Sequence, residues 1–368
     1  MSSSIAKHRL SLDNAVSRKD YQGQAMAQKI TIVGNGSMAT VCALLLESRG
    51  AAVTLWGATP ENMAELIQTR ENRRYLPGYR LPESIRITSD DAQAMADCDL
   101  IVTAIPTQFM RKTWKRLAPH TPPGVPIASV SKGIENETLL RPTQIVADVL
   151  SSQGQDHPDR PARPLAAISG PSVADEMARC LPATVCVASD DEELGKLIQK
   201  TFNCHWFRVY TNSDLLGVEL AGATKNVIAL AAGILDGLQA GINAKSALLS
   251  RGLAEITRLG LAMGARQETF FGIAGVGDLA TTCFSPTGRN RTCGELLGKG
   301  RKLEEILTNI HGVVEGVPTT RSVVTLAEKY RVEMPITQTI HKVLFEGLDP
   351  IEGISSLMSR ELKHERIG

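Results

Sequence analysis

Lys225 is the residue whose surroundings point most strongly to chemistry. It lies in Glu219-Leu-Ala-Gly-Ala-Thr-Lys-Asn226, within a segment, 215–235, that is almost uniformly Ala, Leu, Ile, Val and Gly. Burying an unpaired ammonium group is costly, so a lysine kept there is expected to have a function. Burial lowers the pKa of a lysine and suits it to exchange protons near neutral pH. The alternative is a lysine that snorkels to solvent from the helix end.

Polar residues also follow several of the expected strands. Lys132 comes directly after the strand expected at 127–131, while the runs 106–111 and 170–172 follow two other strands in the same way. Because doubly wound sheets bind ligands at the carboxyl ends of their strands, we expect these loops to line one crevice. Lys132 there could contact a substrate or a nicotinamide. A solvated loop lysine is the alternative.

Two polar motifs interrupt the apolar second half of the chain, Gly275-Val-Gly-Asp278 and Thr287-Gly-Arg-Asn-Arg291. Arg289 and Asn290 precede a helix expected at 293–297. A guanidinium can pair two phosphate oxygens, and free helix N–H groups can add to it, so this pair is a candidate phosphate clamp. A helix-start arginine facing solvent is the alternative. The seven histidines fall in no motif, which makes lysine the better candidate base.

A glycine-rich turn indicates which cofactor these groups would serve. Lys29-Ile-Thr-Ile-Val-Gly-Asn-Gly-Ser-Met-Ala39 reads as a strand, a turn and the start of a helix. Gly34 would permit the tight reversal, Gly36 would let a pyrophosphate approach the backbone, and Ala39 would let the helix pack on the strand. A second strand, 52–56, follows at the spacing of one βαβ unit. A turn of this kind that binds nothing is the alternative.

The elements that must position these residues fall into two groups. Strand-like runs alternate with helical segments from 29 to about 210, at 30–33, 53–56, 100–105, 127–131, 166–168, 184–187 and 207–210. Such alternation predicts an α/β Rossmann domain with a doubly wound, mostly parallel sheet. Helical patterns then follow at 215–235, 247–263, 303–310, 319–329 and 336–345. We therefore expect an N-terminal extension at 1–28, a Rossmann domain at 29–211 and an all-α domain at 212–368.

Composition excludes several classes of protein. The chain has 368 residues, of which 43% are hydrophobic, and it is longer than a domain with a single hydrophobic core usually is, so we expect two domains. The 40 basic and 39 acidic residues nearly cancel, so no global field favours nucleic acid. Seven scattered cysteines suggest neither a disulfide framework nor a metal site, and a reducing cytoplasm fits best. We expect no membrane span and no signal peptide. Residues 1–28 are polar, and translation could instead begin at Met26.

Beside these patterns, the chain resembles the bacterial NAD(P)-dependent glycerol-3-phosphate dehydrogenases from residue 29 to about 345. The resemblance rests on motifs in the same order and at the same spacing. They are Asn72-Arg-Arg-Tyr-Leu-Pro-Gly78, Val130-Ser-Lys-Gly-Ile-Glu135, Gly170-Pro-Ser172, 219–230, Thr257-Arg-Leu-Gly260, Gly275-Val-Gly-Asp278, Arg289-Asn290 and Val313-Val-Glu-Gly316.

The resemblance implies reduction of dihydroxyacetone phosphate to sn-glycerol 3-phosphate by NADH or NADPH, without a metal, to supply phospholipid synthesis. It implies Lys225 as the proton donor and acceptor, with Lys132 and Asp278 beside it. The implied substrate contacts are Lys132, Gly170, Ser172, Asn226, Asp278, Gly288, Arg289 and Asn290. The implied cofactor contacts are Gly34, Gly36, Ser37, Met38, Ala39, Phe109, Lys132, Ala174, Arg289, Val313 and Glu315. We also expect a homodimer.

The chain departs from the family pattern at four positions. Met38 replaces an aromatic residue, Ala58 replaces an arginine or histidine after the second strand, Gly288 replaces a serine, and Ile242 replaces an aspartate. The first two bear on cofactor affinity and on the choice between NAD and NADP. Two rival functions remain, a related β-hydroxyacid or sugar-acid dehydrogenase and a nucleotide sensor that has lost turnover. Arg289-Asn290 argues against the first, and the retained Lys132, Lys225 and Asp278 argue against the second.

Overall fold

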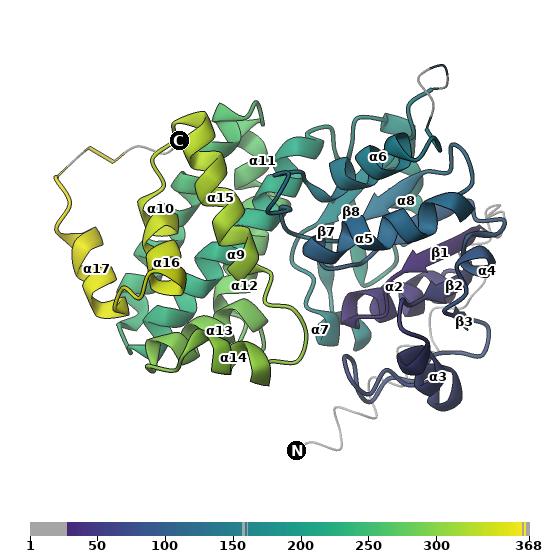
Figure 1. Ribbon diagram of the computed structural model, residues 1–368, viewed down its shortest axis with the longest axis horizontal. Coiled ribbons are helices and arrows are strands. Elements are labelled where there is room, and N and C mark those ends of the chain that lie inside the picture. The colour runs from purple at the N-terminus through teal and green to yellow at the C-terminus, as the bar shows by residue number, and fades with distance from the viewer. Residues whose placement is uncertain (1–27, 157–158, 160, 363, 366–368) are drawn as a thin grey trace.

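The first half of the chain forms one eight-stranded sheet (Figure 1). The structure is a computed structural model that describes residues 28–156, 159, 161–362 and 364–365. The strand order is β3-β2-β1-β4-β5-β6-β7-β8, and every pair is parallel except β6 with β7. The strands are β1 (Lys29–Val33), β2 (Ala52–Trp56), β3 (Arg86–Thr88), β4 (Leu100–Thr103), β5 (Ile127–Ser129), β6 (Leu165–Ser169), β7 (Ala183–Ser189) and β8 (Phe207–Asn212).

Helices cover both faces of this sheet. Successive strand residues point to opposite faces, and in β1 Ile32 belongs to one apolar cluster while Val33 belongs to another. The first cluster includes residues of α2 (Ser37–Ser48), α7 (Ala174–Ala178) and α8 (Glu192–Phe202), and the second includes residues of α4 (Asp91–Met95), α5 (Thr107–Leu117) and α6 (Pro142–Ser152). The predicted doubly wound, mostly parallel sheet is therefore confirmed.

The strand order reverses between β1 and β4, and the chain there is unusually tight. Gly34, directly after β1, has φ +128°, and a Cβ atom on it would lie 2.7 Å from the carbonyl oxygen of Ala104. Only glycine fits such a close approach of two backbones. A crevice opens at the carboxyl ends of parallel strands at a point of this kind.

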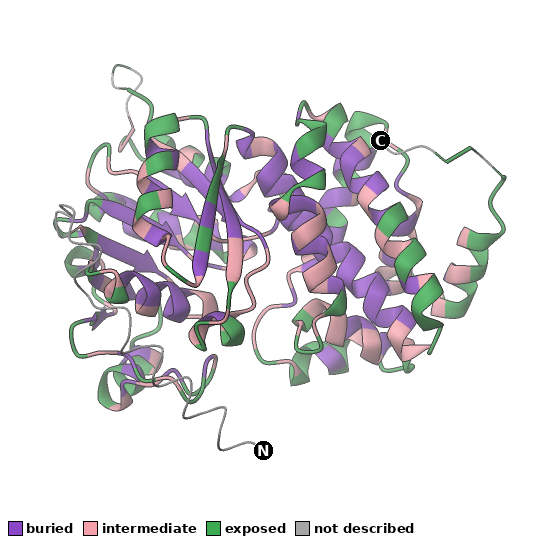
Figure 2. Ribbon diagram, turned by 180° about the vertical axis from the view of Figure 1, so that it is seen from behind, coloured by how far each residue is buried: buried purple, intermediate pink, exposed green. Residues whose placement is uncertain are grey.

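The second half of the described chain is a bundle of helices around α9 (Leu215–Gly237). Within α9 every residue from 215 to 235 except Leu216 is buried, and Figure 2 shows this buried interior. Asp214 caps the start of α9, because its side chain accepts a hydrogen bond from the backbone N–H of Gly217. The other helices are α10 (Gly241–Ala262), α11 (Gln267–Phe271), the π-helix η2 (Ile273–Gly277), α12 (Asp278–Phe284), α13 (Arg289–Gly298), α14 (Leu303–Asn309), α15 (Gly316–Tyr330), α16 (Pro335–Phe345) and α17 (Pro350–Met358).

Helices α9 and α13 pack with their backbones in contact. A Cβ atom on Gly233 would lie 2.0 Å from the carbonyl oxygen of Arg291, and one on Gly294 would lie 2.0 Å from that of Leu230. Gly237 and Gly298 continue the same contact one turn later. Because any side chain at these positions would force the helices apart, the spacing between α9 and α13 is fixed by backbone atoms.

The predicted strands coincide with seven of the observed ones, with small differences at the ends. β4 and β5 stop two residues before their predicted ends, and β3 was not predicted. A three-residue strand leaves too little alternation to recognise. The remaining short elements are α3 (Pro60–Thr69) and η1 (Ala118–His120). The expected extension at 1–28 and the alternative start at Met26 lie outside the described residues, apart from Gln28. The domain division at 211/212 remains our proposal.

Candidate active site

One cavity of about 1030 Å³ lies between the sheet and the helical bundle, and it collects most of the predicted site residues. It is lined by the turn after β1, the loops after β4 and β5, residues of α9 and α12, and the start of α13. All predicted contacts line it except two. Ala39 is fully buried in α2, where it serves the predicted packing of the helix on the strand and not the implied contact with the cofactor, and Gly170 accepts a hydrogen bond from Lys132.

Lys225 and Lys132 meet at the carboxylate of Asp278. The Nζ atom of Lys225 donates to Oδ1 of Asp278, and the Nζ atom of Lys132 lies 2.7 Å from Oδ2. Lys225 also donates to the hydroxyl of Thr282 at 2.6 Å, and Ser169 donates to Oδ2 of Asp278 at 3.2 Å. The lysines come from the helical bundle and from the sheet, so this cluster joins the two parts of the molecule.

Burial governs the proton affinity of the cluster. Lys225 is 6% exposed, and its desolvation, opposed by Asp278 and assisted by Lys132, lowers its pKa to about 7. Burial alone would raise the pKa of Asp278, but the two ammonium groups outweigh it and hold that pKa below its usual value. Asp278 is therefore an anion at neutral pH, while Lys225 exists in both protonation states. The alternative of a snorkelling Lys225 is wrong.

Lys132 is held by the loop after β6. Its Nζ atom donates to the carbonyl oxygen of Gly170 at 3.1 Å and to the hydroxyl of Ser172 at 3.4 Å. Gly170 has φ +140°, and a Cβ atom there would lie 2.9 Å from Cα of Val185. Only glycine fits at position 170, and the backbone conformation that it adopts directs its carbonyl oxygen to Lys132.

Two asparagines connect the helices around the cavity. Asn226 of α9 donates to the carbonyl oxygen of Lys132 at 3.2 Å. Asn290 of α13 donates to the side-chain oxygen of Asn226 at 2.9 Å and accepts from the N–H of Gly316 at 2.8 Å. Asn290 is therefore engaged mainly in joining α9, α13 and α15.

Arg289 is the first residue of α13 rather than a residue before that helix, because α13 begins four residues earlier than predicted. Its guanidinium lies against Gly312, where a Cβ atom would come within 2.7 Å of Nη1. Among the described residues it has no hydrogen-bond partner, so its donors are available to a ligand. The first N–H groups of α13 lack a side-chain cap at Gly288 and line the same cavity.

The opposite end of the cavity suits a dinucleotide. Helix α2 begins beside Gly36, which provides no side-chain cap, so its first N–H groups can receive an anion. A Cβ atom on Gly36 would meet nothing within 4 Å, so the approach to this backbone is open. Met38 lines the cavity and also packs against the core of the sheet. Phe109, 54% exposed, and Ala174 line the cavity beside it.

Glu315 links the two parts of the molecule at the rim of this site. Its Oε1 atom accepts from the backbone N–H of Thr107 at 3.0 Å, at the start of α5. Its Oε2 atom and the hydroxyl of Thr107 are buried without a partner among the described residues. Burial raises the pKa of Glu315 to about 7. Both atoms lie against Gly133, where a Cβ atom would come within 2.6 Å of the Thr107 hydroxyl and 3.0 Å of Oε2 of Glu315. Val313 lines the same rim.

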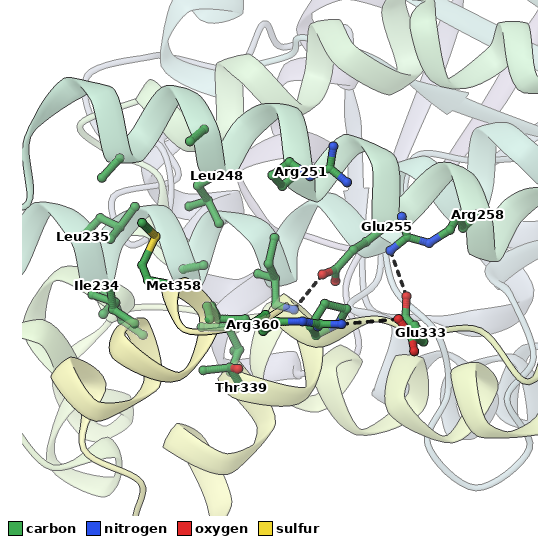
Figure 3. Close-up of a pocket in the computed structure, with 18 of the residues that line it drawn as sticks. Ile234, Leu235, Leu248, Arg251, Glu255, Arg258, Glu333, Thr339, Met358 and Arg360 are labelled. Carbon is green, nitrogen blue, oxygen red and sulfur yellow. Dashed lines mark hydrogen bonds and ion pairs between the residues drawn. The ribbon is translucent and has the colours of Figure 1, made fainter. Parts of the chain in front are cut away.

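A second cavity, of about 1270 Å³, lies between helices of the bundle and the chain segment that follows α17 (Figure 3). Aliphatic residues of α9, α10, α16 and α17 line it, and none of the predicted site residues does. Its buried carboxylate, Glu255, accepts from the N–H groups of Ile336 and Thr337 at 2.7 and 3.2 Å and so caps α16. Glu255 thus has a structural role.

A family model described as the N-terminus of NAD-dependent glycerol-3-phosphate dehydrogenase matches residues 29–195, and the model of its C-terminus matches residues 214–355. The chain belongs to the NAD-dependent glycerol-3-phosphate dehydrogenase family. The resemblance inferred from the motifs is confirmed.

Relatives in this family match the chain over nearly their whole length. Glycerol-3-phosphate dehydrogenase [NAD(P)+] of Pelotomaculum thermopropionicum is 46% identical over 92% of this chain and 95% of its own. The enzyme of the same name from Geobacter sp. (strain M21) is 45% identical over 93% and 100%. The crystal structure of glycerol-3-phosphate dehydrogenase from Coxiella burnetii superposes with a TM-score of 0.85 at 37% identity, covering 90% of this chain and 99% of that one.

The four departures from the family pattern lie in different places. Met38, Ala58 and Gly288 line the cavity, whereas Ile242 is 79% exposed at the start of α10 and does not line it. Sequence reasoning missed Thr282, the hydroxyl that contacts Lys225. A threonine four residues after Asp278 on one helix face could have suggested it.

Two further findings bear on the class of protein. Helix α9 is long and apolar enough to cross a membrane, but all of its most apolar 18-residue window is buried inside the protein, as in the core helix of a soluble protein. Within the described residues, no group of three or more His, Cys, Asp or Glu side chains could hold a metal ion.

Proposed function

We propose that this protein reduces dihydroxyacetone phosphate to sn-glycerol 3-phosphate with NADH or NADPH, reversibly. The observation that carries the proposal is the buried cluster of Lys225, Asp278 and Lys132 in the same cavity as a dinucleotide-type turn and an uncapped helix N-terminus. Membership of the glycerol-3-phosphate dehydrogenase family supports it.

Lys225 is the proposed proton donor and acceptor. When bound, the reduced nicotinamide supplies the hydride that adds to C2 of the ketone. The charged form of Lys225 then protonates the alkoxide that develops on the carbonyl oxygen, and the neutral form removes that proton in the reverse reaction. A pKa near 7 provides both forms at neutral pH. Asp278 and Thr282 hold Nζ in one position, which limits the orientations that the proton can take.

Lys132 is the proposed second contact to the carbonyl. Asp278, Gly170 and Ser172 engage all three N–H groups of its ammonium, so its fixed charge stabilises negative charge developing on the substrate oxygen. A direct bond to that oxygen would replace the long one to Ser172, at 3.4 Å. Asn226 holds the backbone of Lys132 through its carbonyl oxygen and is proposed to keep that ammonium in place.

Arg289 and the first N–H groups of α13 are the proposed phosphate site. A guanidinium with available donors at a helix N-terminus suits a dianion, and binding there adds energy remote from the reacting carbon. The same feature weighs against a carboxylate substrate, which would not need it. Because both lysines and Asp278 are in contact, a sensor without turnover is also disfavoured.

We further infer a cytoplasmic location and a homodimer. Six cysteines are free thiols, which is the usage of a reducing compartment: Cys42, Cys98, Cys186, Cys204, Cys283 and Cys293. The homodimer rests on expectation from the family, and sedimentation of the purified chain tests it.

The test of the proposed function is a coupled absorbance assay. Purified protein is mixed with dihydroxyacetone phosphate and either NADH or NADPH, and loss of the reduced nicotinamide band is followed. Turnover with at least one nucleotide is expected, and none when unphosphorylated hydroxy acids are offered with NAD+ or NADP+ instead. Absence of turnover with both nucleotides would favour the sensor.

A further inference from the structure

The loop after β2 lacks the basic or acidic side chain that usually reads the adenosine ribose of a dinucleotide. Rossmann domains commonly place an Asp or Glu there for the ribose hydroxyls of NAD, or an Arg for the 2′-phosphate of NADP. Here Gly57, Ala58 and Thr59 follow the strand. The loop therefore carries neither an acidic nor a basic side chain, and a residue that recognises position 2′ of the ribose would have to come from another element.

Arg116, near the end of α5, reaches this loop. Its Nη1 atom donates to the carbonyl oxygen of Ala58 at 2.9 Å, and its guanidinium lies over the ring of Trp56, 5.2 Å from the centroid. Both residues lie at the carboxyl end of β2. The arginine side chain is 41% exposed and lines the cavity. It therefore occupies the region that a basic residue on the loop would otherwise serve.

Asp91 holds Arg116 from the other side. Its two oxygens accept from Nε and Nη2 of Arg116 at 2.6 and 2.7 Å, and one of them also accepts from Nε1 of Trp56 at 3.0 Å. Asp91 is less exposed, at 17%, and does not line the cavity. A ligand in the cavity thus meets the guanidinium, with the carboxylate behind it.

The hydrogen bonds of Arg116 leave room for one more acceptor. With Ser89, whose carbonyl oxygen accepts from Nη2 at 3.2 Å, the contacts within the described chain use four of its five N–H groups. The fifth, on Nη1, is available to an anion. Asp91 balances most of the positive charge, so the attraction for a phosphate is moderate.

We propose that Arg116 is the residue that recognises the group at position 2′ of the adenosine ribose, and that Asp91 sets how strongly Arg116 binds that group. The balanced pair accepts both a 2′-hydroxyl and a 2′-phosphate, which gives comparable use of the two nucleotides. The inference rests on the proposed use of NAD(P)H, but it concerns the adenosine end of the cavity and not the chemistry at Lys225.

Binding of adenosine 2′,5′-bisphosphate and of 5′-AMP to the full-length protein, measured by calorimetry without substrate, tests the proposal. Arg116→Gln should weaken the bisphosphate about tenfold and change 5′-AMP less than about twofold, because a charge-assisted hydrogen bond is lost from one ligand alone. Asp91→Asn removes the balancing charge and should strengthen the bisphosphate by about fivefold. Arg116→Lys, which keeps the charge, should lie between wild type and Arg116→Gln.

Matched controls remove a positive charge elsewhere in the same cavity. Lys112→Gln, one turn earlier on α5, and Arg74→Gln, beside Tyr75, should change both ligands by the same factor. The ratio of kcat/KM for NADPH to that for NADH should follow the binding ratios in every variant. Thermal unfolding of each variant identifies any that fail to fold. If Arg116→Gln does not fold, Arg116→Lys and Asp91→Asn still test the proposal.

Three results would overturn the proposal. Equal losses for both ligands in Arg116→Gln and Asp91→Asn would mean that the pair only holds the loop. If the ratio of bisphosphate affinity to 5′-AMP affinity changes in Lys112→Gln or Arg74→Gln instead, another cation recognises position 2′. A bisphosphate affinity that does not rise in Asp91→Asn would remove the role of the carboxylate. If dihydroxyacetone phosphate is not turned over but the binding ratios change as expected, only the proposed substrate fails.

Discussion

Replacing Lys225 by Met separates proton transfer from architecture. Methionine has similar length but neither charge nor donors, so the variant loses the contacts of Nζ with Asp278 and Thr282. Loss of a general acid or base should lower kcat by at least ~10²-fold. Nucleotide binding should change little, because the turn after β1 lies at the other end of the cavity.

The stability cost of this change can be bounded from the contacts. Breaking a buried ion pair typically costs about 3–5 kcal/mol because a charge is left unpaired. Here Asp278 keeps Lys132 at 2.7 Å, so we expect a loss in the free energy of unfolding below about 3 kcal/mol. The folded fraction at assay temperature should therefore stay high.

Lys245→Met is the matched control. Lys245 is also buried, its side chain being 10% exposed against 7% for Lys225, and it pairs with Asp236 at 2.7 Å. Asp236 likewise keeps a second cation, Arg291, at 2.5 Å. Because Lys245 does not line the cavity, this variant should lose comparable stability and retain kcat.

Steady-state and single-turnover rates, with nucleotide affinity and denaturant unfolding measured on the same preparations, complete the comparison. If Lys225→Met keeps more than half of the wild-type kcat, the proton comes from another group and the cluster is structural. Equal losses of kcat in both variants would show that rigidity, and not proton transfer, is being measured.

Two other measurements test separate parts of the site, and a third tests the helical bundle. Arg289→Ala should raise KM for dihydroxyacetone phosphate about 10- to 100-fold, since a charge-assisted hydrogen bond contributes roughly 1.5–3 kcal/mol, and should barely affect unphosphorylated dihydroxyacetone; equal effects on both would refute the phosphate assignment. The kcat for reduction should fall, and that for oxidation rise, as pH increases through about 7, because reduction needs charged Lys225 and oxidation needs the neutral form; parallel profiles in both directions would contradict this. Burial raises the pKa of Glu255 from 4.5 to about 7, so folding takes up a proton between those pH values and the free energy of unfolding falls as pH rises from 4.5 to 7. Glu255→Gln should remove up to about 3 kcal/mol of this pH dependence, measured by denaturant unfolding. If the free energy of unfolding of the variant depends on pH as that of the wild type does, other groups cause the dependence.

The sequence predicted those features that depend on local patterns. The apolar run around Lys225 indicated a buried helix, and the glycines after the first strand indicated a nucleotide turn. Each pattern lies within one contiguous stretch of chain. The function of Asp278 came from family resemblance, since nothing local pairs it with Lys225, 53 residues away, or with Lys132, 146 residues away.

Other features depended on contacts that no local pattern contains. The start of α13 was placed too late because its first turn is polar and lacks a capping side chain at Gly288. Arg116 was overlooked because its charge lies on an ordinary amphipathic helix, 58 residues beyond the loop that it contacts. Only the tertiary fold brings the side chain of Arg116 to the loop after β2.

The backbone contact between α9 and α13 has a consequence for substrate length. Lys225 is carried by one helix and Arg289 by the other, while Gly233 and Gly294 hold those helices at a separation that no side chain can adjust. The span between the proton donor and the proposed phosphate site is therefore insensitive to repacking of the core. Laboratory evolution towards longer phosphorylated ketones should accumulate changes in the loops that close the cavity, and variants that enlarge residues at the helix contact should lose folding before they gain a new substrate.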